Sequence, residues 1–346
     1  MFVMTVAIWA AAPAAAEDTI EAVAPAVAPP VAVAYADIRG TGADAYASIA
    51  DLRAGVVDRH VPGTTFVATR GKTVRVARVT YHKTDQGWIA AAALLWKTPS
   101  EFVGLELPAP ATSPFAWVLP KKRGETVPVL AAPARDAAEV RALARRELVT
   151  VLEDRGDHSR IGPDEWVESA RLRVVRPAPR PDVLAADARW IDIDLDQQVL
   201  VAYQGDTPVF ATLVSTGRKK WRTPPGVYRI HHKLDRTRMR SPDGLGQAWN
   251  VADVPWAMTF RKHFALHGAY WHDGFGVARS HGCVNLSVGD ARRIYDWTSP
   301  AVAAGERAAD APLDGGTVIR IRDRRSPQPP WRDFEGKRID PAVAAP

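Results

Sequence analysis

The 346-residue chain contains a single cysteine, Cys283. One cysteine cannot close a disulfide within the chain, and it cannot supply a thiolate cage for structural zinc. Cys283 must therefore be incidental, form an intermolecular bond or take part in chemistry. Because a free cysteine is most often a small buried hydrophobic residue, the case for chemistry depends on the residues around it.

The chain also lacks a strong excess of charge and any apolar run of membrane-spanning length. Lys and Arg number 45 against 39 Asp and Glu, which gives a formal net charge of +6. This excess is too small and too dispersed to predict nucleic-acid binding, although it suits a partner rich in carboxylates or phosphates. We expect no transmembrane span. A hydrophobic content of 47% is ordinary for a globular protein, and the length allows about two or three domains.

The first residues share some features of a secretory signal. Residues 2–12 form a short apolar run, and the alanines at 14–16 offer a small-residue cleavage site before Glu17. The basic start of such a signal is missing, because no Lys or Arg precedes Arg39. We predict that residues 1–16 are a signal peptide and that the protein is exported. The alternative is an ordinary Ala-rich tail.

Proline-rich segments divide the rest of the chain, since proline interrupts regular secondary structure. We predict an Ala- and Pro-rich linker over residues 17–59, a second Pro-rich linker over 177–187, and a Pro-rich tail over 326–346. Residues 60–176 alternate short β-prone runs with turn residues, as small β-barrels do. This pattern predicts a β-rich middle region, followed by a separate domain over residues 188–325.

Alternation of apolar and polar residues predicts a β-dominated C-terminal domain. The predicted strands are residues 190–195, 199–203, 208–214, 227–231 and 317–322. Ser287 and Asp290 have the spacing of a capping box, which predicts one main helix at about residues 288–298. The expected fold class is therefore mainly β.

Two histidines flank Cys283 in a pattern that suits nucleophilic catalysis. His281 lies two residues before the cysteine and His267 sixteen residues before it. An imidazole can remove the thiol proton, and an imidazolium or converging backbone N–H groups can stabilise the thiolate. Gly282 permits an unusual turn that would aim backbone N–H groups at a tetrahedral oxyanion. These residues outline a cysteine acyl-transfer site.

The same residues resemble the signature of the L,D-transpeptidase catalytic domain. In that family a His-Gly pair, here His267 and Gly268, precedes a run of Ser-His-Gly-Cys, an aliphatic residue and Asn or Arg, here Ser280 to Asn285. Further motifs follow in the family's order over about residues 188–323. They are IDIDLDQQVLVAY, VSTG, TPPGVYRI and VPWAMTF. Several ordered motifs are far more specific than one short pattern.

The chain departs from the family pattern at two places. TPPG replaces the usual TPTG, which removes one hydroxyl and stiffens a turn without touching the catalytic set. Residues 299–315 lengthen the usually short path between the helix and the last strand. We expect this insertion to alter one wall of the pocket and hence the substrate preference.

The middle region carries a second resemblance. Residues 126–175 resemble the bacterial Src-homology-3-like wall-binding module, through the runs VPVLAAPA, RELVTVLED and HSRIGPDEWVESARLRVV. Residues 66–96, which include DQGWIAAAALL, would be a second and poorer copy. The alternative is a generic β-rich appendage without a ligand.

The first resemblance implies an L,D-transpeptidase-like β-sandwich with one main helix, preceded by a small β-barrel-like region. It implies that Cys283 attacks the bond between the diamino acid and D-alanine of a peptidoglycan stem tetrapeptide and forms a thioester. An amine of a neighbouring stem, or of a wall-anchored protein, would then take the acyl group. The expected location is the periplasm or cell wall, with no cofactor, no metal and no nucleic acid involved.

The resemblance also implies roles for single residues. Cys283 is the expected nucleophile and His267 the general base, while His281 holds His267 or the thiolate electrostatically or is merely structural. Backbone N–H groups of residues 281–283 would form the oxyanion hole. Loop support is assigned to Gly282, Ser280 and Asn285, and substrate binding to Gly268, Trp256 and Arg279. His272 is expected at the surface or behind the site.

Two other functions remain open at this point. If water resolves the thioester, the enzyme is a carboxypeptidase, or an amidase that detaches anchored proteins. If the domain containing Cys283 has lost its activity, the protein is a non-catalytic wall-binding protein. The presence of every expected catalytic side chain favours an enzyme.

Overall fold

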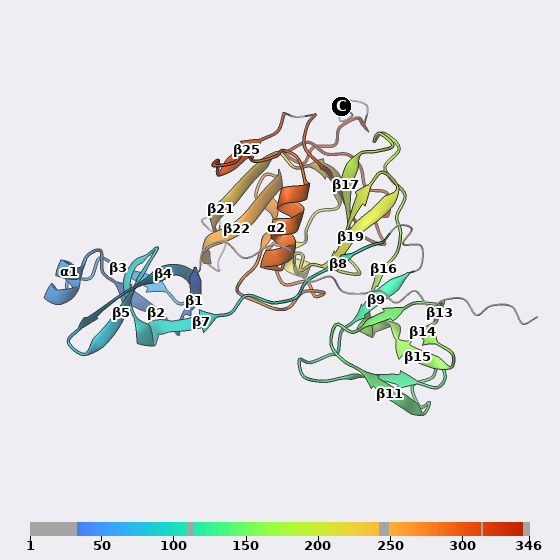
Figure 1. Ribbon diagram of the computed structural model, residues 1–346, viewed down its shortest axis with the longest axis horizontal. Coiled ribbons are helices and arrows are strands. Elements are labelled where there is room, and N and C mark those ends of the chain that lie inside the picture. Colours follow the sequence, from blue (N-terminus) through green and yellow to red (C-terminus); the bar gives the residue numbers. More distant parts are fainter. Residues whose placement is uncertain (1–32, 109–113, 242–248, 313, 342–346) are drawn as a thin grey trace, which may run out of the picture.

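The computed structural model describes residues 33–108, 114–241, 249–312 and 314–341. The predicted signal peptide lies outside the described residues. The described chain is mainly β, as predicted, and Figure 1 shows three parts. We call them the N-terminal module (residues 34–97), the middle module (115–175) and the C-terminal domain (189–341). None of the described helices has the length and apolar character needed to cross a membrane.

The N-terminal module occupies part of the segment predicted to be a linker. Its strands are β1 (Ala34–Ile38), β2 (Gly42–Ala45), β3 (Arg59–Pro62), β4 (Thr65–Val76), β5 (Val79–Thr84), β6 (Gly87–Ala90) and β7 (Leu94–Lys97). Helix α1 (Ile49–Ala54) is held by a capping box between Ser48 and Asp51. The linker prediction is therefore wrong for residues 34–59. The prolines that suggested it end at Pro30, and the alanines beyond them pack in a core.

The middle module consists of two small antiparallel sheets packed on each other. Its strands are β9 (Phe115–Val118), β10 (Val127–Leu130), β11 (Glu139–Leu143), β12 (Leu148–Thr150), β13 (Glu153–Arg155), β14 (His158–Gly162), β15 (Glu165–Glu168) and β16 (Leu172–Val175). Sheet orders are β11-β10-β15-β14-β13 and β12-β9-β16, and the described strands form no closed barrel. Buried valines and leucines from both sheets, such as Val129 and Leu172, fill the core between them.

The first sheet of the C-terminal domain contains the predicted meander. Its strands are β17 (Arg189–Asp194), β18 (Val199–Gln204), β19 (Thr207–Leu213), β20 (Gly226–Arg229) and β26 (Val318–Arg322), with β8 (Leu105–Glu106) added from the preceding linker. The order is β20-β26-β17-β18-β19-β8. Asp192 of β17 accepts from Arg320 at 2.6 Å and from Arg322 at 2.9 Å, so the buried parallel pair of β17 and β26 is also tied by charge.

The second sheet faces the first across the main core and carries the catalytic motif. Its strands are β21 (His232–Arg240), β22 (Asn250–Arg261), β23 (Phe264–Gly268), β24 (Val284–Leu286) and β25 (Ala308–Asp310). Helix α2 (Val288–Trp297) begins where predicted, because the Ser287 hydroxyl accepts from the Asp290 N–H at 3.2 Å. Apolar residues from both sheets and α2 share one buried cluster, which makes the domain the expected β-sandwich with one main helix.

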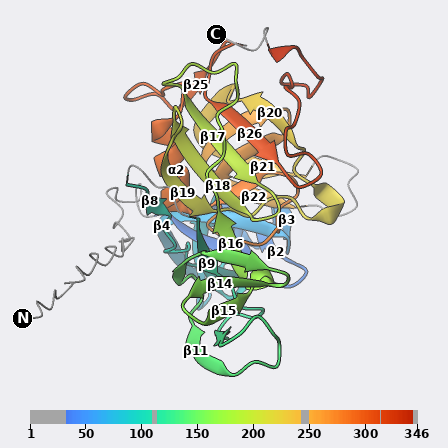
Figure 2. The same ribbon diagram turned by 90° about the vertical axis from the view of Figure 1, so that its right-hand side faces the viewer.

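Two junctions join the upstream parts to this domain. Strand β22 pairs in parallel with β4 through Asn250 and Val251, so the N-terminal module's sheet continues into the second sheet. The middle module lies below the first sheet in Figures 1 and 2. The tail also returns to the domain, since Trp331 is buried and forms a bridge with Val227.

The 299–315 insertion lies away from the cysteine. Its strand β25 pairs with β21, whereas Cys283 immediately precedes β24 at the other side of the sheet. Strands β21, β22 and β23 lie between β25 and β24. The expectation that this insertion shapes the wall of the pocket around Cys283 gains no support from the fold.

Candidate active site

His267 lies on β23, and Cys283 immediately precedes the neighbouring parallel strand β24. In the register of β23 and β24, His267 is opposite Asn285, which lies two residues beyond Cys283. The register therefore places Cys283 directly before the strand that pairs with the strand of His267. The cysteine sulfur itself lies 3.8 Å from the backbone carbonyl of His263, in the turn between β22 and β23.

His267 is held as a neutral base. Its Nδ1 lies 3.1 Å from the carbonyl oxygen of Gly268, and since a carbonyl only accepts, Nδ1 carries the ring proton. Nε2 is left with a lone pair. The side chain is 2% exposed, and this burial lowers the pKa of His267 to about 4, opposed by the hydrogen bond to Gly268. At neutral pH the imidazole is uncharged and able to take a proton.

Cys283 is held as a neutral thiol. The residue is partly exposed, and its sulfur lies against the turn that precedes β23. Desolvation raises the pKa of the Cys283 thiol to about 11, against a smaller opposing effect of the Ala265 backbone. The resting site therefore pairs a thiol with a neutral imidazole rather than a thiolate with an imidazolium. Proton transfer must accompany attack on a substrate.

The turn before Cys283 is fixed by two hydroxyl groups. Ser280 Oγ donates to the Cys283 carbonyl at 2.5 Å and accepts from the Gly282 N–H at 3.0 Å. Thr223 Oγ1 donates to the Gly282 carbonyl at 2.7 Å. Gly282 has φ 127° and faces the Phe264 ring, where a Cβ would lie 2.7 Å from a ring carbon. Only glycine fits this turn.

This arrangement corrects the expected oxyanion hole. The Gly282 N–H already donates to Ser280, so it cannot also stabilise an oxyanion in this conformation. In the described part of the chain, the N–H groups of His281 and Cys283 have no hydrogen-bond partner and remain the candidate donors. Ser280 and Gly282 serve the turn, which is the loop support that was expected of them.

His281 lies at the rim of the site and not in it. The side chain is exposed, and its ring lies between Trp221 at 4.3 Å and Trp249 at 5.5 Å between centroids. Its Nε2 accepts from Arg218 at 2.9 Å, and burial and this arginine lower its pKa. These contacts involve neither His267 nor Cys283, so the structure gives no contact through which His281 would support them.

Two of the three predicted substrate-binding residues are packing residues. Trp256 is buried, with its ring 5.2 Å from that of Tyr295 and 4.2 Å from the guanidinium of Arg292 on α2. Gly268 allows close packing, since a Cβ there would lie 2.9 Å from Pro255. These two assignments are corrected. Arg279 is exposed beside the site, as a substrate-binding residue would have to be.

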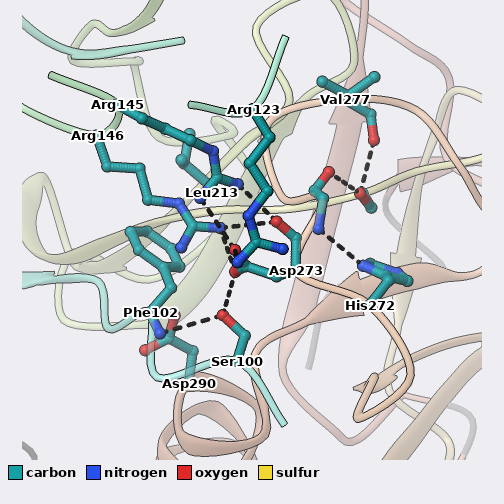
Figure 3. Close-up of polar contacts among 12 residues, drawn as sticks. Ser100, Phe102, Arg123, Arg145, Arg146, Leu213, His272, Asp273, Val277 and Asp290 are labelled. Carbon is teal, nitrogen blue, oxygen red and sulfur yellow. Dashed lines mark hydrogen bonds and ion pairs between the residues drawn. The ribbon is translucent and has the colours of Figure 1, made fainter. Parts of the chain in front are cut away.

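His272 contacts the site, although we expected it at the surface or behind the site. Its Nε2 lies 3.0 Å from the side-chain amide of Asn285. Its Nδ1 accepts from the Gly274 N–H at 3.2 Å (Figure 3). Since Nδ1 accepts, Nε2 carries the ring proton, and the amide satisfies the ring when its oxygen faces His272. Burial, and then the charge of Arg279, lower the pKa of His272 to about 4. No single-sequence signal separates His272 from a surface histidine.

The comparisons agree with the resemblance. Residues 188–321 match the family model of the YkuD L,D-transpeptidase catalytic domain. The predicted resemblance to this family is therefore confirmed over these residues. A search of curated proteins gave no match.

Several solved L,D-transpeptidase structures are similar to the chain. A cysteine-to-serine variant of the Enterococcus faecium L,D-transpeptidase is 18% identical, covering 39% of this chain and 50% of that one, with a TM-score of 0.31. An L,D-transpeptidase from Mycobacterium smegmatis is 22% identical, covering 39% of this chain and 58% of that one, with a TM-score of 0.30. L,D-transpeptidase 3 from Mycobacterium tuberculosis is 17% identical, covering 51% of this chain and 75% of that one, with a TM-score of 0.32. The match thus spans about half the length of the first two proteins.

Proposed function

We propose that the protein is a peptidoglycan L,D-transpeptidase that works through a thioester on Cys283. The observation that carries this proposal is the pairing of the strand that holds a buried neutral imidazole, that of His267, with the strand that the chain's single thiol directly precedes. The Gly268 carbonyl orients that imidazole so that Nε2 is the basic atom. The pairing lies in the segment that matches an L,D-transpeptidase catalytic domain.

In the first step, Cys283 attacks the carbonyl between the diamino acid and D-alanine of a stem tetrapeptide. His267 Nε2 takes the thiol proton as the carbon–sulfur bond forms. The N–H groups of His281 and Cys283 are the candidate donors to the oxyanion. When the carbon–nitrogen bond breaks, His267 returns the proton to the leaving amine. D-alanine is released, and the stem remains as a thioester.

In the second step, an amine attacks the thioester and restores the thiol. His267 takes a proton from the attacking nitrogen and returns it to the departing sulfur. We propose that the amine is the side chain of a neighbouring stem's diamino acid, which gives a direct cross-link between two stems. The exposed cations Arg218 and Arg279, at the rim of the site, would meet the carboxylates that such stems carry.

Action on peptidoglycan requires an exported protein. We propose that the chain works in the periplasm or cell wall and that residues 1–16 direct it there. The middle module would hold it near its polymeric substrate, as a Src-homology-3-like wall-binding module does.

Product analysis tests the proposal. The protein is incubated with purified tetrapeptide muropeptides, and the products are analysed by mass spectrometry. We expect free D-alanine and cross-linked dimers, both absent with Cys283→Ala. Shortened monomers without dimers would show that water resolves the thioester, and the proposed transpeptidase would instead be a carboxypeptidase. Full turnover by Cys283→Ala would overturn the thioester mechanism, and no turnover by the wild type would leave only a binding role.

A further inference from the structure

Arginines of the middle module bind the segment that connects the two proposed catalytic residues, His267 and Cys283. We call residues 269–282, between His267–Gly268 and Cys283, the active-site loop. At its centre, Asp273 receives Arg145 Nη1 on Oδ2 at 3.0 Å and Arg146 Nη2 on Oδ1 at 2.6 Å (Figure 3). Arg123 approaches Oδ2 to 3.7 Å, and Ser100 Oγ also donates to the carboxylate.

Arginines of the middle module contact the backbone of the loop as well as the side chain of Asp273. The carbonyl oxygen of Asp273 accepts from Arg145 at 2.6 Å and from Arg146 at 3.0 Å. Three residues on, the Gly276 carbonyl accepts from Nε of Arg173, also in the middle module, at 2.6 Å. Contacts to carbonyls fix the path of the chain, which a side-chain ion pair alone would not do.

The side chains of this cluster are more buried than those of an ordinary surface ion pair. The Asp273 side chain is 19% exposed, that of Arg146 15% and that of Arg145 23%. Arg146 also packs its guanidinium 4.4 Å from the centre of the Phe102 ring. Burial opposes ionisation of Asp273, yet the hydrogen bond from Ser100 and the arginines hold the pKa of Asp273 below its usual value. Forked, half-buried contacts of this kind are stronger than exposed pairs.

The loop position gripped by the arginines adjoins the catalytic residues. Asp273 directly follows His272, whose ring contacts Asn285. Asn285 is opposite His267 in the strand register and lies two residues beyond Cys283. A shift of Asp273 would therefore move His272 away from Asn285 and disturb the chain on both sides of Cys283.

We propose that Arg145, Arg146 and Asp273 form a clasp by which the middle module positions the active site. The clasp holds His272 against Asn285 and fixes the active-site loop, which leads directly into Cys283. Arg145 and Arg146 are thus positioning residues supplied by a module outside the catalytic domain. As far as it concerns turnover, this inference rests on the proposed function.

Cys283 alkylation tests the clasp without any peptidoglycan substrate. Since the full-length chain has one cysteine, the rate of iodoacetamide modification followed by mass spectrometry reports on Cys283 alone. In Asp273→Asn the loop loosens, and we expect the rate at pH 8 to rise about tenfold for each unit by which the thiol pKa falls. Turnover of muropeptides falls in the same variant, so reactivity and catalysis move in opposite directions.

Asp154 provides a matched control within the middle module. It also accepts from a serine, Ser159 Oγ at 2.7 Å, and pairs with an arginine, Arg176, but it does not touch the active-site loop. Asp154→Asn should leave the alkylation rate unchanged. An equal rise in Asp154→Asn and Asp273→Asn would mean that any damage to the module exposes the thiol, which would overturn the clasp.

A second variant covers the case in which Asp273→Asn does not fold. Combined Arg145→Lys and Arg146→Lys substitutions keep both charges but lose the forked contacts to the carboxylate and the carbonyl. We expect an intermediate rise in alkylation with unchanged circular dichroism. An unchanged alkylation rate in this folded protein would overturn the proposal. If alkylation responds but wild-type muropeptide turnover is absent, the clasp holds and the proposed function fails.

Discussion

The two upstream modules hold the same loop by different physical means. The N-terminal module stacks Tyr35 on Tyr270 with ring centroids 3.6 Å apart and places Phe66 6.0 Å from Trp271. The middle module instead uses arginines on Asp273, two residues further along. The chain between His267 and Cys283 is thus held by aromatic contacts at Tyr270 and Trp271 and by charged contacts at Asp273.

The difference indicates which of the two sets of contacts depends on salt and pH. The stack of Tyr35 on Tyr270 is buried, with Phe66 and Trp271 partly buried beside it. The pairing of β4 with β22 adds backbone hydrogen bonds to these contacts. Apolar burial depends little on salt or pH. The arginine contacts are half-buried and depend on the ionised carboxylate of Asp273, so salt and acid weaken them. We infer that the N-terminal module is part of the rigid fold, whereas the middle module makes an adjustable contact.

Truncating the aromatic contact should have the largest effect. Tyr270→Ala removes a fully buried ring and should lower the free energy of unfolding by about 3–5 kcal/mol. Tyr270→Phe keeps the stack and loses only the hydrogen bond to Ala252, at a cost of about 1 kcal/mol. Urea denaturation measures both. Equal losses of unfolding free energy in the two variants would show that the ring contributes nothing, and the contrast between aromatic and charged contacts would fail.

The burial of His267 under Trp271, 5.7 Å away between ring centroids, makes stability depend on pH. Burial lowers the folded pKa of His267 from 6.5 to about 4, so the unfolded chain binds the proton more readily. The resulting stability is complete above pH 6.5 and is lost as pH falls toward 4, by about 3 kcal/mol.

Urea denaturation across this range checks the prediction, with His267→Gln reducing the acid loss. The pKa of His60 is raised mainly by Asp44, which gives the opposite sign, so His60→Gln should not reduce it. An unchanged slope in His267→Gln would contradict the assigned burial.

Removing one arginine of the clasp should have an intermediate effect. Arg146→Met leaves the Asp273 carboxylate with fewer donors and should cost about 2 kcal/mol. Raising the salt concentration from 0.05 to 0.5 M should shrink the difference between Arg146→Met and wild type, because salt screens the contact that the variant lacks. The same salt change should leave the cost of Tyr270→Ala unaltered. Equal salt dependence in both variants would remove the distinction between the two holds.

The smallest effect is expected at the C-terminal end of the middle module, where Asp154 pairs with the residue that follows the module. Arg176 and Asp154 form an ion pair whose side chains are 43% and 51% exposed. Arg176→Gln should change the free energy of unfolding by less than about 1 kcal/mol. A loss as large as that of Arg146→Met would show that the position in the fold, and not burial, sets the strength of these pairs.

The sequence predicted the parts of this fold that depend on local patterns. The meander of β17, β18 and β19 follows from alternation of apolar residues, and helix α2 from the cap at Ser287. The neighbours of Cys283 are recognisable because the motif is continuous in the chain. These features need no knowledge of distant contacts.

The remaining features depend on tertiary contacts that local patterns do not encode. Trp256 was wrongly expected to contact substrate because its motif does not show that the ring packs against Tyr295 and Arg292 of α2. The partners Arg145 and Asp273 are 128 residues apart. Nothing near either one indicates the other. The linker prediction failed because alanine-rich strands and a proline-rich spacer have similar composition.

The acyl-enzyme provides the most direct test of the central claim, that Cys283 is the nucleophile of an acyl transfer. The intact protein is mixed with a tetrapeptide stem and quenched in acid, and its mass is measured. We predict a mass increase equal to the stem without its terminal D-alanine, localised to Cys283 by peptide mapping and absent in Cys283→Ala. The same increase in Cys283→Ala, or at another residue of the wild type, would contradict the account.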